Sequence, residues 1–394
     1  MGMSFQNGLS KSRMLIVQPY VPAYRVPLFR EMRLQLEAEG IEMKLAVAGA
    51  QRGDSERADD RSGETADYLV RSNTRRLGSR VFLNRDLENP LTNFLPGLVI
   101  VEQAIKNLES WPLLINSGKR GHPSVAMWGQ GRSYSTSQST LEASIKQWLT
   151  RRSDWFFSYT QAGANHVSKN GFPKDRITVL RNSTDTKSLQ SELTNITPLE
   201  LLEFREKNGL ELGKTAVYIG GLDDRKGIRF LLEAARRISQ HLPGFKLLIG
   251  GSGDLEGLVQ SHQKEGSPIV YLGRIEDKEK ALALSASTLL LIPVWVGLVA
   301  VDSLAAQVPI VTTFHPSHSP EFDYLVNQET TIIVQYDIDI YSQTVLNLLA
   351  DSARVARLSD NCVTGLDGLS IEEMASNFVL GITSWRDTTR LTSD

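Results

Sequence analysis

The residues from Pro293 to Val311, PVWVGLVAVDSLAAQVPIV, combine a strand end, a glycine turn and a helix start with one acid. Gly297 permits a tight turn, and small and apolar residues then open a helix. The first turn of a helix offers unpaired N–H groups and the positive end of the helix dipole, which favour an anion. Asp302 is the only charged residue of the segment, and an acid after such a turn commonly holds the ribose of a nucleotide. The segment therefore indicates a nucleotide site.

Two cations follow a strand end in YIGGLDDRKGIRFLLEAA. Gly220 and Gly221 come after the apolar strand residues, and Arg225 and Lys226 stand just before a helix. Cations beside a helix start bind phosphate well, because charge-assisted hydrogen bonds add to the attraction of the helix dipole. We predict that Arg225 and Lys226 clamp a diphosphate, although an isolated pair of this kind is more often a solvated basic turn.

Two more glycine turns follow predicted strands in the same half of the chain. In LLIGGSGDLEGL, Gly251 and Gly253 fit the start of a dinucleotide-binding fingerprint, but Glu256 stands where that fingerprint has its third glycine. In YLGRI, the backbone from Gly273 to Ile275 is placed to hydrogen-bond the edge of a base. Alone, the first turn is more often a sharp turn and the second an ordinary strand exit.

Length and composition bound the class of protein. A chain of 394 residues with 41% hydrophobic and 22% charged residues is long enough for two globular domains. The formal net charge of −2 argues against a dedicated nucleic-acid-binding protein. The single cysteine, Cys362, excludes a disulfide framework and a zinc site built on cysteines. The polar N-terminus and the short apolar runs predict neither a signal peptide nor a spanning helix, so we expect a cytoplasmic protein.

Predicted strands and helices alternate about every 25 residues, which is typical of a parallel sheet with crossover helices. The pattern predicts an α/β protein with two doubly wound, Rossmann-like domains that face a central cleft. Residues 51–97 are rich in Arg, Asp, Gly and Ser, and we interpret them as long loops and broken elements. The predicted organisation is a tail at 1–12, an N-terminal domain at 13–185, a polar linker at 186–212, a C-terminal domain at 213–375 and a helix at 376–394 that returns to the first domain.

The order of these segments resembles the family-4-type retaining glycosyltransferases of the GT-B fold, in their bacterial polysaccharide branch. The family has G-R-L-x-x-x-K-G, G-x-G, F-L-G and P-x-x-x-E-x-F-G-L-V-x-L-E-A-M-A-x-G-x-P-V-V. Here the corresponding segments are GGLDDRKG, IGGSG, YLGRI and PVWVGLVAVDSLAAQVPIV. QPYVPAYRVPLF, MWGQGRS, RITVLRNSTDT and HSPEFDYL are similar to further family segments, so the resemblance covers 14–385.

The resemblance implies transfer of a sugar from a nucleotide-diphosphate sugar to a polysaccharide, oligosaccharide or lipid-linked acceptor, with retention of the anomeric configuration. A UDP- or GDP-sugar is the expected donor. Because the donor is a substrate, we expect no cofactor and no metal. In the mechanism proposed for the family the leaving phosphate takes the acceptor proton, which leaves positioning and charge to the protein. The resemblance places the donor on the C-terminal domain and the acceptor on the N-terminal domain.

Residues are assigned to these roles by their match to the family segments. The catalytic candidates are Arg225, Lys226 and Gln130. The nucleotide-binding candidates are Gly220, Gly221, Arg225, Lys226, Gly251, Gly273, Arg274, Ile275, Leu298, Val299 and Asp302. The candidates for the donor sugar are Gln130, Val296 and Gly297, and those for the acceptor are Tyr24, Arg25 and Arg132.

Five positions depart from the family pattern. Val294 replaces the first of two glutamates, eight residues before the second, which is Asp302 here. A valine can neither donate nor accept a hydrogen bond, so the sugar half of the site looks altered while the nucleotide half is mostly retained. Gly221 stands in place of the arginine of G-R-L, Gln130 in place of the histidine of W-G-H-G, and Gln307 in place of a glycine.

The arginine-rich part of the N-terminal domain has two interpretations. Arginines interspersed with acids are typical of a solvated loop face. The alternative is docking to anionic headgroups or to a lipid-diphosphate-linked acceptor, as a peripheral protein on the inner face of the membrane, with Trp111 and Phe94 as apolar anchors. Trp128 follows the strand residues VAM and is predicted to belong to the core. The arginines are Arg52, Arg57, Arg61, Arg71, Arg75, Arg76, Arg80 and Arg85.

Three hypotheses stay open from the sequence. The first is an active glycosyltransferase. The second is a catalytically altered pseudo-glycosyltransferase that serves as a partner subunit, which the departures at Val294, Gly221 and Gln130 motivate. The third is another GT-B enzyme, such as a sugar-nucleotide epimerase or a phosphorylase, for which we find no set of catalytic acids with a histidine. The retained Arg225 and Lys226 favour the first hypothesis.

Overall fold

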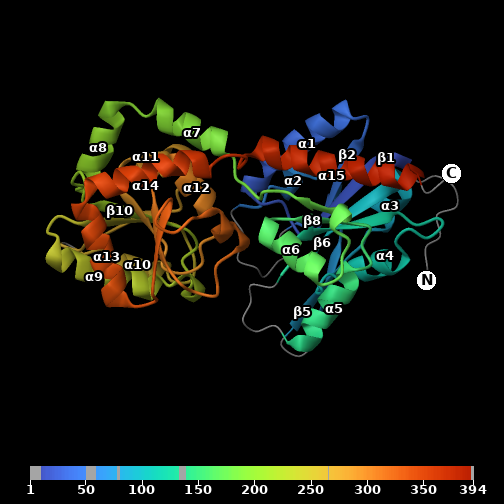
Figure 1. The fold of residues 1–394 in the computed structure, drawn as a ribbon, viewed down its shortest axis with the longest axis horizontal. Coiled ribbons are helices and arrows are strands. Elements are labelled where there is room, and N and C mark those ends of the chain that lie inside the picture. Colours follow the sequence, from blue (N-terminus) through green and yellow to red (C-terminus); the bar gives the residue numbers. More distant parts are fainter. Residues whose placement is uncertain (1–9, 50–58, 78–79, 133–138, 265, 392–394) are drawn as a thin grey trace. The chain divides into compact units, whose positions relative to one another are not determined.

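The structure is a computed structural model that describes residues 10–49, 59–77, 80–132, 139–264 and 266–391 (Figure 1). The chain divides into two compact units. The first unit consists of Met1–Asn182 with Ile371–Asp394, and the second of Ser183–Ser370. Each unit contains an open sheet of parallel strands with helical crossovers, so the predicted α/β class with two Rossmann-like domains is confirmed.

The sheet of the first unit has the order β3-β2-β1-β6-β7-β8-β9, and all its strands pair in parallel. Alternate residues of the apolar run MLIV enter two separate core clusters, with Met14 and Ile16 in one and Leu15 and Val17 in the other. Both faces of the sheet are therefore covered, which explains why its strands are apolar without alternation. The strands are β1 (Ser10–Gln18), β2 (Glu42–Val47), β3 (Tyr68–Leu69), β6 (Pro96–Glu102), β7 (Ser124–Gly129), β8 (Trp155–Ser158) and β9 (Ile177–Val179).

Helices of the first unit come from both ends of the chain. The C-terminal helix α15 packs along α1, as Figure 1 shows for the red and blue ribbons, and it begins before the predicted return at 376–394. Strand β1 likewise begins inside the predicted tail at 1–12. The helices are α1 (Val26–Ala38), α2 (Ser62–Thr65), α3 (Glu88–Phe94), α4 (Ser110–Asn116), α5 (Thr140–Thr150), α6 (Gln161–Lys169) and α15 (Ile371–Leu391).

The segment 51–97, interpreted as long loops and broken elements, contains regular secondary structure in its second half. Strands β4 (Ser72–Leu77) and β5 (Arg80–Arg85) form an antiparallel hairpin, and α3 follows it. Arginines occupy several positions of both strands, so the hairpin lacks the alternation of apolar and polar residues that would have revealed it. Arg52 and Arg57 lie outside the described residues.

The sheet of the second unit has the order β12-β11-β10-β13-β14-β15, again with parallel pairing throughout. Its strands are β10 (Thr215–Ile219), β11 (Lys246–Gly250), β12 (Ile269–Gly273), β13 (Leu289–Leu291), β14 (Ile310–Thr313) and β15 (Thr331–Val334). Its helices are α7 (Thr186–Asn195), α8 (Pro198–Asn208), α9 (Ile228–His241), α10 (Glu256–His262), α11 (Asp277–Ser285), α12 (Val299–Ala306), α13 (Ile338–Ala350) and α14 (Ser352–Gly365).

The residues predicted as a linker at 186–212 form helices α7 and α8 of the second unit. The side chain of Asp185 caps α7 by accepting a hydrogen bond from the backbone N–H of Ser188, at 3.0 Å. Thr197 and Glu200 form a capping box at the start of α8. The polar residues that resembled a linker are thus helix caps, and the spacing T-x-x-E was the available signal.

Candidate functional site

The second unit has its topological switch point between β10 and β13. From β10 the chain builds outward to β11 and β12, and it then crosses to the other side of β10 for β13. Ligands of doubly wound sheets bind at such a point, outside the carboxyl ends of the strands. The two loops at this edge, 220–227 and 292–298, contain half of the residues predicted to bind the donor.

These two loops lie in contact, and glycines make the close approach possible. Gly227 has φ +72°, and a Cβ atom there would lie 3.0 Å from Cγ2 of Val294. Gly251 has φ +153°, and a Cβ atom there would lie 1.9 Å from the carbonyl oxygen of Gly220. A side chain at either glycine would collide with its neighbour, so the close approach at this edge requires glycine at both positions.

Trp295 brings the two predicted phosphate-binding cations together. Its ring centroid lies 4.7 Å from Nζ of Lys226 and 5.4 Å from Cζ of Arg225. Arg225 is exposed and also pairs with Asp223, with 3.1 Å between Nε and Oδ1. Lys226 is half-buried, and this burial lowers its pKa to about 8. No role for Trp295 was evident from the sequence.

The backbone at Trp295 is strained, with φ +62° in a residue that is not glycine. Buried polar groups of 313–319 hold the loop in this form. Thr313 Oγ1 donates to the carbonyl oxygen of Pro293 at 2.6 Å, and Ser319 N–H donates to that of Val296 at 2.8 Å. The third contact comes from His318, whose Nδ1 accepts the N–H of Val296 at 3.0 Å.

His318 is buried and stacks on Phe322, with 4.1 Å between ring centroids. Its Nε2 lies 2.8 Å from the carbonyl oxygen of Thr313. Nδ1 accepts and Nε2 donates, so the imidazole is neutral in this arrangement. Desolvation lowers the pKa of His318, which agrees with the neutral form. We assign His318 the role of holding the loop that carries Trp295, a role that the motif HSPEFDYL did not by itself indicate.

The carboxylate of Asp302 has two protein partners. Nζ of Lys280 lies 2.6 Å from Oδ2, and the hydroxyl of Thr184 donates to Oδ1 at 3.2 Å. Asp302 is 8% exposed in the first turn of α12. The ribose contact predicted for Asp302 therefore competes with an ion pair to Lys280 of α11, which no local sequence pattern indicates.

The other predicted nucleotide-binding residues lie along the same strand ends. Gly220 N–H donates to Gly250 O at 3.0 Å, and the carbonyl oxygen of Gly221 accepts the hydroxyl of Tyr218 at 2.8 Å. Gly273 O accepts the N–H of Gly251 at 2.7 Å. Arg274 pairs with Glu276, and Ile275 belongs to the core. Val296 and Gly297 lie in the loop after β13, while Leu298 and Val299 begin α12, whose N-cap makes no side-chain hydrogen bond.

In the first unit, Arg25 is buried, and its predicted contact with the acceptor stays a prediction. It is 5% exposed, donates to Oδ1 of Asn182 at 2.7 Å and lies 5.2 Å from the ring of Trp128. Trp128 is buried, as predicted. Tyr24 is exposed and covers Arg25, with 5.0 Å between the guanidinium carbon and the ring centroid. Arg132 follows the end of β7 and is exposed.

A large pocket lies at the carboxyl ends of β6 and β7, with a volume of about 830 Å³. Gln130 lines it, together with apolar and aromatic side chains and two acids. The volume is in the range of sites for small molecules. Residues that line it include Phe82, Glu102, Trp111, Gln130, Lys146 and Tyr159.

Glu102 is one of the two acids of this pocket, neither of which was predicted from the sequence. It ends β6, and Nδ2 of Asn107 donates to its Oε2 at 3.2 Å. Desolvation raises the pKa of Glu102, although Arg85 acts in the opposite direction. An acid at the end of an apolar strand was the available signal. Such a carboxyl can bind a hydroxyl group as acceptor or, when protonated, as donor.

Gln130 belongs to the first unit, and Val296 and Gly297 belong to the second, so the predicted contacts to the donor sugar are divided between the units. The described residues contain no group of three or more His, Cys, Asp or Glu side chains that could hold a metal ion. In the same residues, no helix is long and apolar enough to cross a bilayer.

The chain was compared with protein families and with curated proteins, and the matching family model lies within the second unit. Residues 213–351 match the family model described as glycosyl transferases group 1. A phosphatidyl-myo-inositol mannosyltransferase of Mycobacterium tuberculosis is 31% identical over 106 residues, which are 26% of this chain and 28% of that protein. Its counterpart from Mycobacterium leprae is 33% identical over 107 residues, 26% of this chain and 29% of that protein. The chain thus matches less than a third of the length of these relatives.

Solved structures resemble the whole chain. A glycosyltransferase from Rickettsia africae ESF-5 has a TM-score of 0.68 at 12% identity, over 95% of this chain and 98% of that one. Anabaena HepE in complex with UDP-glucose has a TM-score of 0.63 at 14% identity, over 97% and 100%. At these identities the likeness shows the fold. In agreement with the resemblance indicated by the sequence, residues 213–351 match the glycosyl transferases group 1 family, and the whole chain has the GT-B fold.

Proposed function

We propose that this chain transfers a glycosyl group from a nucleoside-diphosphate sugar to an acceptor hydroxyl, with retention of the anomeric configuration. The observation that carries the proposal is the pair of cations at the switch point of the second unit, Lys226 and Arg225, beside the ring of Trp295. These residues lie within the part that matches glycosyl transferases group 1. The complex of HepE with UDP-glucose supports a UDP-sugar as the donor, and a GDP-sugar is the second choice.

The chemistry assigned to these residues is electrostatic. Departure of the nucleoside diphosphate develops negative charge on the leaving phosphate, which then takes the proton of the acceptor hydroxyl. The ammonium of Lys226 stabilises that charge, and the half-buried surroundings strengthen the interaction. The N–H groups of Gly297, Leu298 and Val299, at the start of α12, add the helix dipole. These cations supply the positive charge that the reaction needs, so the proposal includes no metal.

The acceptor is assigned to the pocket at the ends of β6 and β7. Glu102 and Gln130 offer hydrogen bonds to hydroxyl groups, and aromatic side chains offer apolar surface. This composition suits a glycan or a lipid-linked acceptor. The mannosyltransferase relatives, named for phosphatidyl-myo-inositol, support a lipid-linked acceptor and a peripheral position at the inner face of the membrane.

Turnover with defined substrates tests the proposal. The protein is incubated with UDP- and GDP-sugars and with glycan or lipid-linked acceptors, and NMR gives the anomeric configuration of the product. Retained configuration is expected, and Lys226→Ala should abolish most of the turnover. Inverted products would refute retention. Nucleotide binding without turnover of any donor would favour a pseudo-glycosyltransferase instead.

A further inference from the structure

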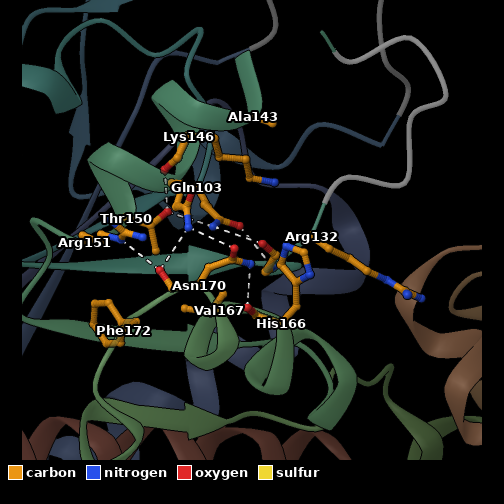
Figure 2. A pocket seen from close by; sticks show the side chains of 12 residues that line it. Gln103, Arg132, Ala143, Lys146, Thr150, Arg151, His166, Val167, Asn170 and Phe172 are labelled. Carbon is orange, nitrogen blue, oxygen red and sulfur yellow. Dashed lines mark hydrogen bonds between the residues drawn. The ribbon is translucent and has the colours of Figure 1, made fainter. Parts of the chain in front are cut away.

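A second, smaller pocket of the first unit lies between α5 and α6, with a volume of about 60 Å³ (Figure 2). Four of its side chains are cationic or titrate to a cation: Arg132, Lys146, Arg151 and His166. None of its twelve lining residues, all of them in the described part of the chain, is an acid. The space exceeds several-fold the ~10–15 Å³ that one water requires, so it admits a small oxyanion.

Hydrogen bonds between lining residues hold the walls of the pocket in place. Nε2 of Gln103 donates to the hydroxyl of Thr150 at 3.0 Å, and Oε1 of Gln103 accepts the N–H of Gly131 at 3.1 Å. Nε2 of Gln147 donates to Oδ1 of Asn170 at 2.9 Å, and Nε of Arg151 donates to the backbone carbonyl oxygen of Asn170 at 2.9 Å. These bonds fix the walls without using Lys146 or His166.

Lys146 and His166 line the space from two different helices, α5 and α6. Figure 2 shows Lys146 on the α5 side and His166 on the α6 side, while Arg132 extends away from the hydrogen-bonded centre. In the described residues no carboxylate forms an ion pair with either Lys146 or His166.

The electrostatics of the pocket favour an anion. Burial lowers the pKa of Lys146 to about 8. Burial also lowers the pKa of His166, and the positive charges of Lys146, Arg132 and Lys169 lower it further. An anion would offset this repulsion and compensate the lysine, which is costly to keep charged and half-buried without a partner.

We propose that this pocket binds the phosphate group of the acceptor, with Lys146 and His166 as hydrogen-bond donors. Gln103 and Lys146 line both this pocket and the larger one at the ends of β6 and β7, so the two spaces adjoin. A phosphate ester in the smaller pocket thus places the remainder of its molecule beside Glu102. The assignment to the acceptor rests on the proposed function, whereas the binding of phosphate does not.

Calorimetric titration of the full chain with inorganic phosphate and with glycerol 3-phosphate tests the site. Lys146→Gln and His166→Gln should each weaken binding about tenfold or more, since each removes a charge-assisted hydrogen bond. Lys169→Gln is the matched control, because it removes one positive charge from α6 without lining the pocket. Its affinity should stay within about twofold of the wild type. In NMR titrations, phosphate should raise the pKa of the His166 imidazole.

Two further measurements identify the source of the phosphate and distinguish a failure of this site from a failure of the proposed function. If Lys146→Gln weakens binding to vesicles of phosphatidylcholine with phosphatidylglycerol, the phosphate belongs to a lipid; if it weakens only soluble phosphates, the acceptor is soluble. Phosphate binding that depends on Lys146 and His166 without any turnover keeps this site and refutes the proposed function. Equal phosphate affinity in the wild type and both variants, or no binding at all, overturns the site.

Discussion

Removal of Lys280 tests the structural role that the ion pair gives to Asp302. The ammonium and carboxylate side chains are only 21% and 11% exposed, and 2.6 Å separates Nζ from Oδ2. At an effective dielectric constant of about 20, charges this close attract by about 6 kcal/mol, and loss of hydration offsets much of that. Lys280→Met would leave the carboxylate of Asp302 in place with the Thr184 hydroxyl. We expect this variant to lose about 2–4 kcal/mol of unfolding free energy.

Urea unfolding of four proteins measures this prediction: the wild type, Lys280→Met, Asp302→Leu and the double variant. Because the double variant leaves neither charge unpaired, it should be more stable than the sum of the single losses implies, by about 1.5–3 kcal/mol. Additive losses, or single variants as stable as the wild type, would refute the reasoning. Lys278→Met is a suitable control, since Lys278 lies on the same helix and pairs with Glu200 at the exposed surface.

Three more substitutions test the loops at the switch point. In urea unfolding, Gly251→Ala should lower the free energy of unfolding by more than about 2 kcal/mol, because its Cβ would overlap the carbonyl oxygen of Gly220. Gly257→Ala on α10 is the control: its Cβ meets open space, so the change should be neutral or slightly stabilising. Similar effects of the two substitutions would contradict the packing. His318→Ala should lower the free energy of unfolding by about 1–3 kcal/mol, because the buried N–H of Val296 loses its acceptor. Since the pKa of His318 is lowered in the folded protein, the wild type should lose stability as the pH falls below about 6.5, whereas the variant should not. A stability difference that does not depend on pH would contradict the neutral imidazole. Val294→Glu should lower both stability and turnover, because a glutamate in this 4%-exposed position would be desolvated without a partner; higher activity on the same donor would show that the sugar site still lacks that carboxylate.

The sequence predicted the architecture well because its strands are apolar runs separated by helices, and both faces of such strands are buried. It did not predict the hairpin β4–β5, whose arginines interrupt the alternation, nor helices α7 and α8, whose caps resemble a polar linker. The local sequence pattern predicts such elements poorly, because tertiary packing and helix capping supply much of their stability.

The candidate site was predictable where a motif fixes the backbone and not where it depends on tertiary contacts. Glycine turns located the strand ends, and the position of Lys226 before a helix indicated a cation at the switch point. The contact of Trp295 with Lys226, the pair of Asp302 with Lys280 and the raised pKa of Glu102 all join residues distant in sequence or depend on burial. The spacing of residues along a single sequence does not reveal contacts of this kind.

Calorimetric titration of UDP and GDP into the wild type, Lys226→Ala and Arg225→Ala tests the central claim most directly, namely that Lys226 binds the donor diphosphate. Lys226→Ala should weaken binding by about 1.5–3 kcal/mol, while Arg225→Ala, which removes an exposed side chain paired with Asp223, should have the smaller effect. The ammonium is charged below its pKa of about 8 and neutral above it, so wild-type affinity should fall as the pH rises through that value, and that fall should be absent in Lys226→Ala. Equal nucleotide affinity in the wild type and Lys226→Ala at pH 7 would contradict the account.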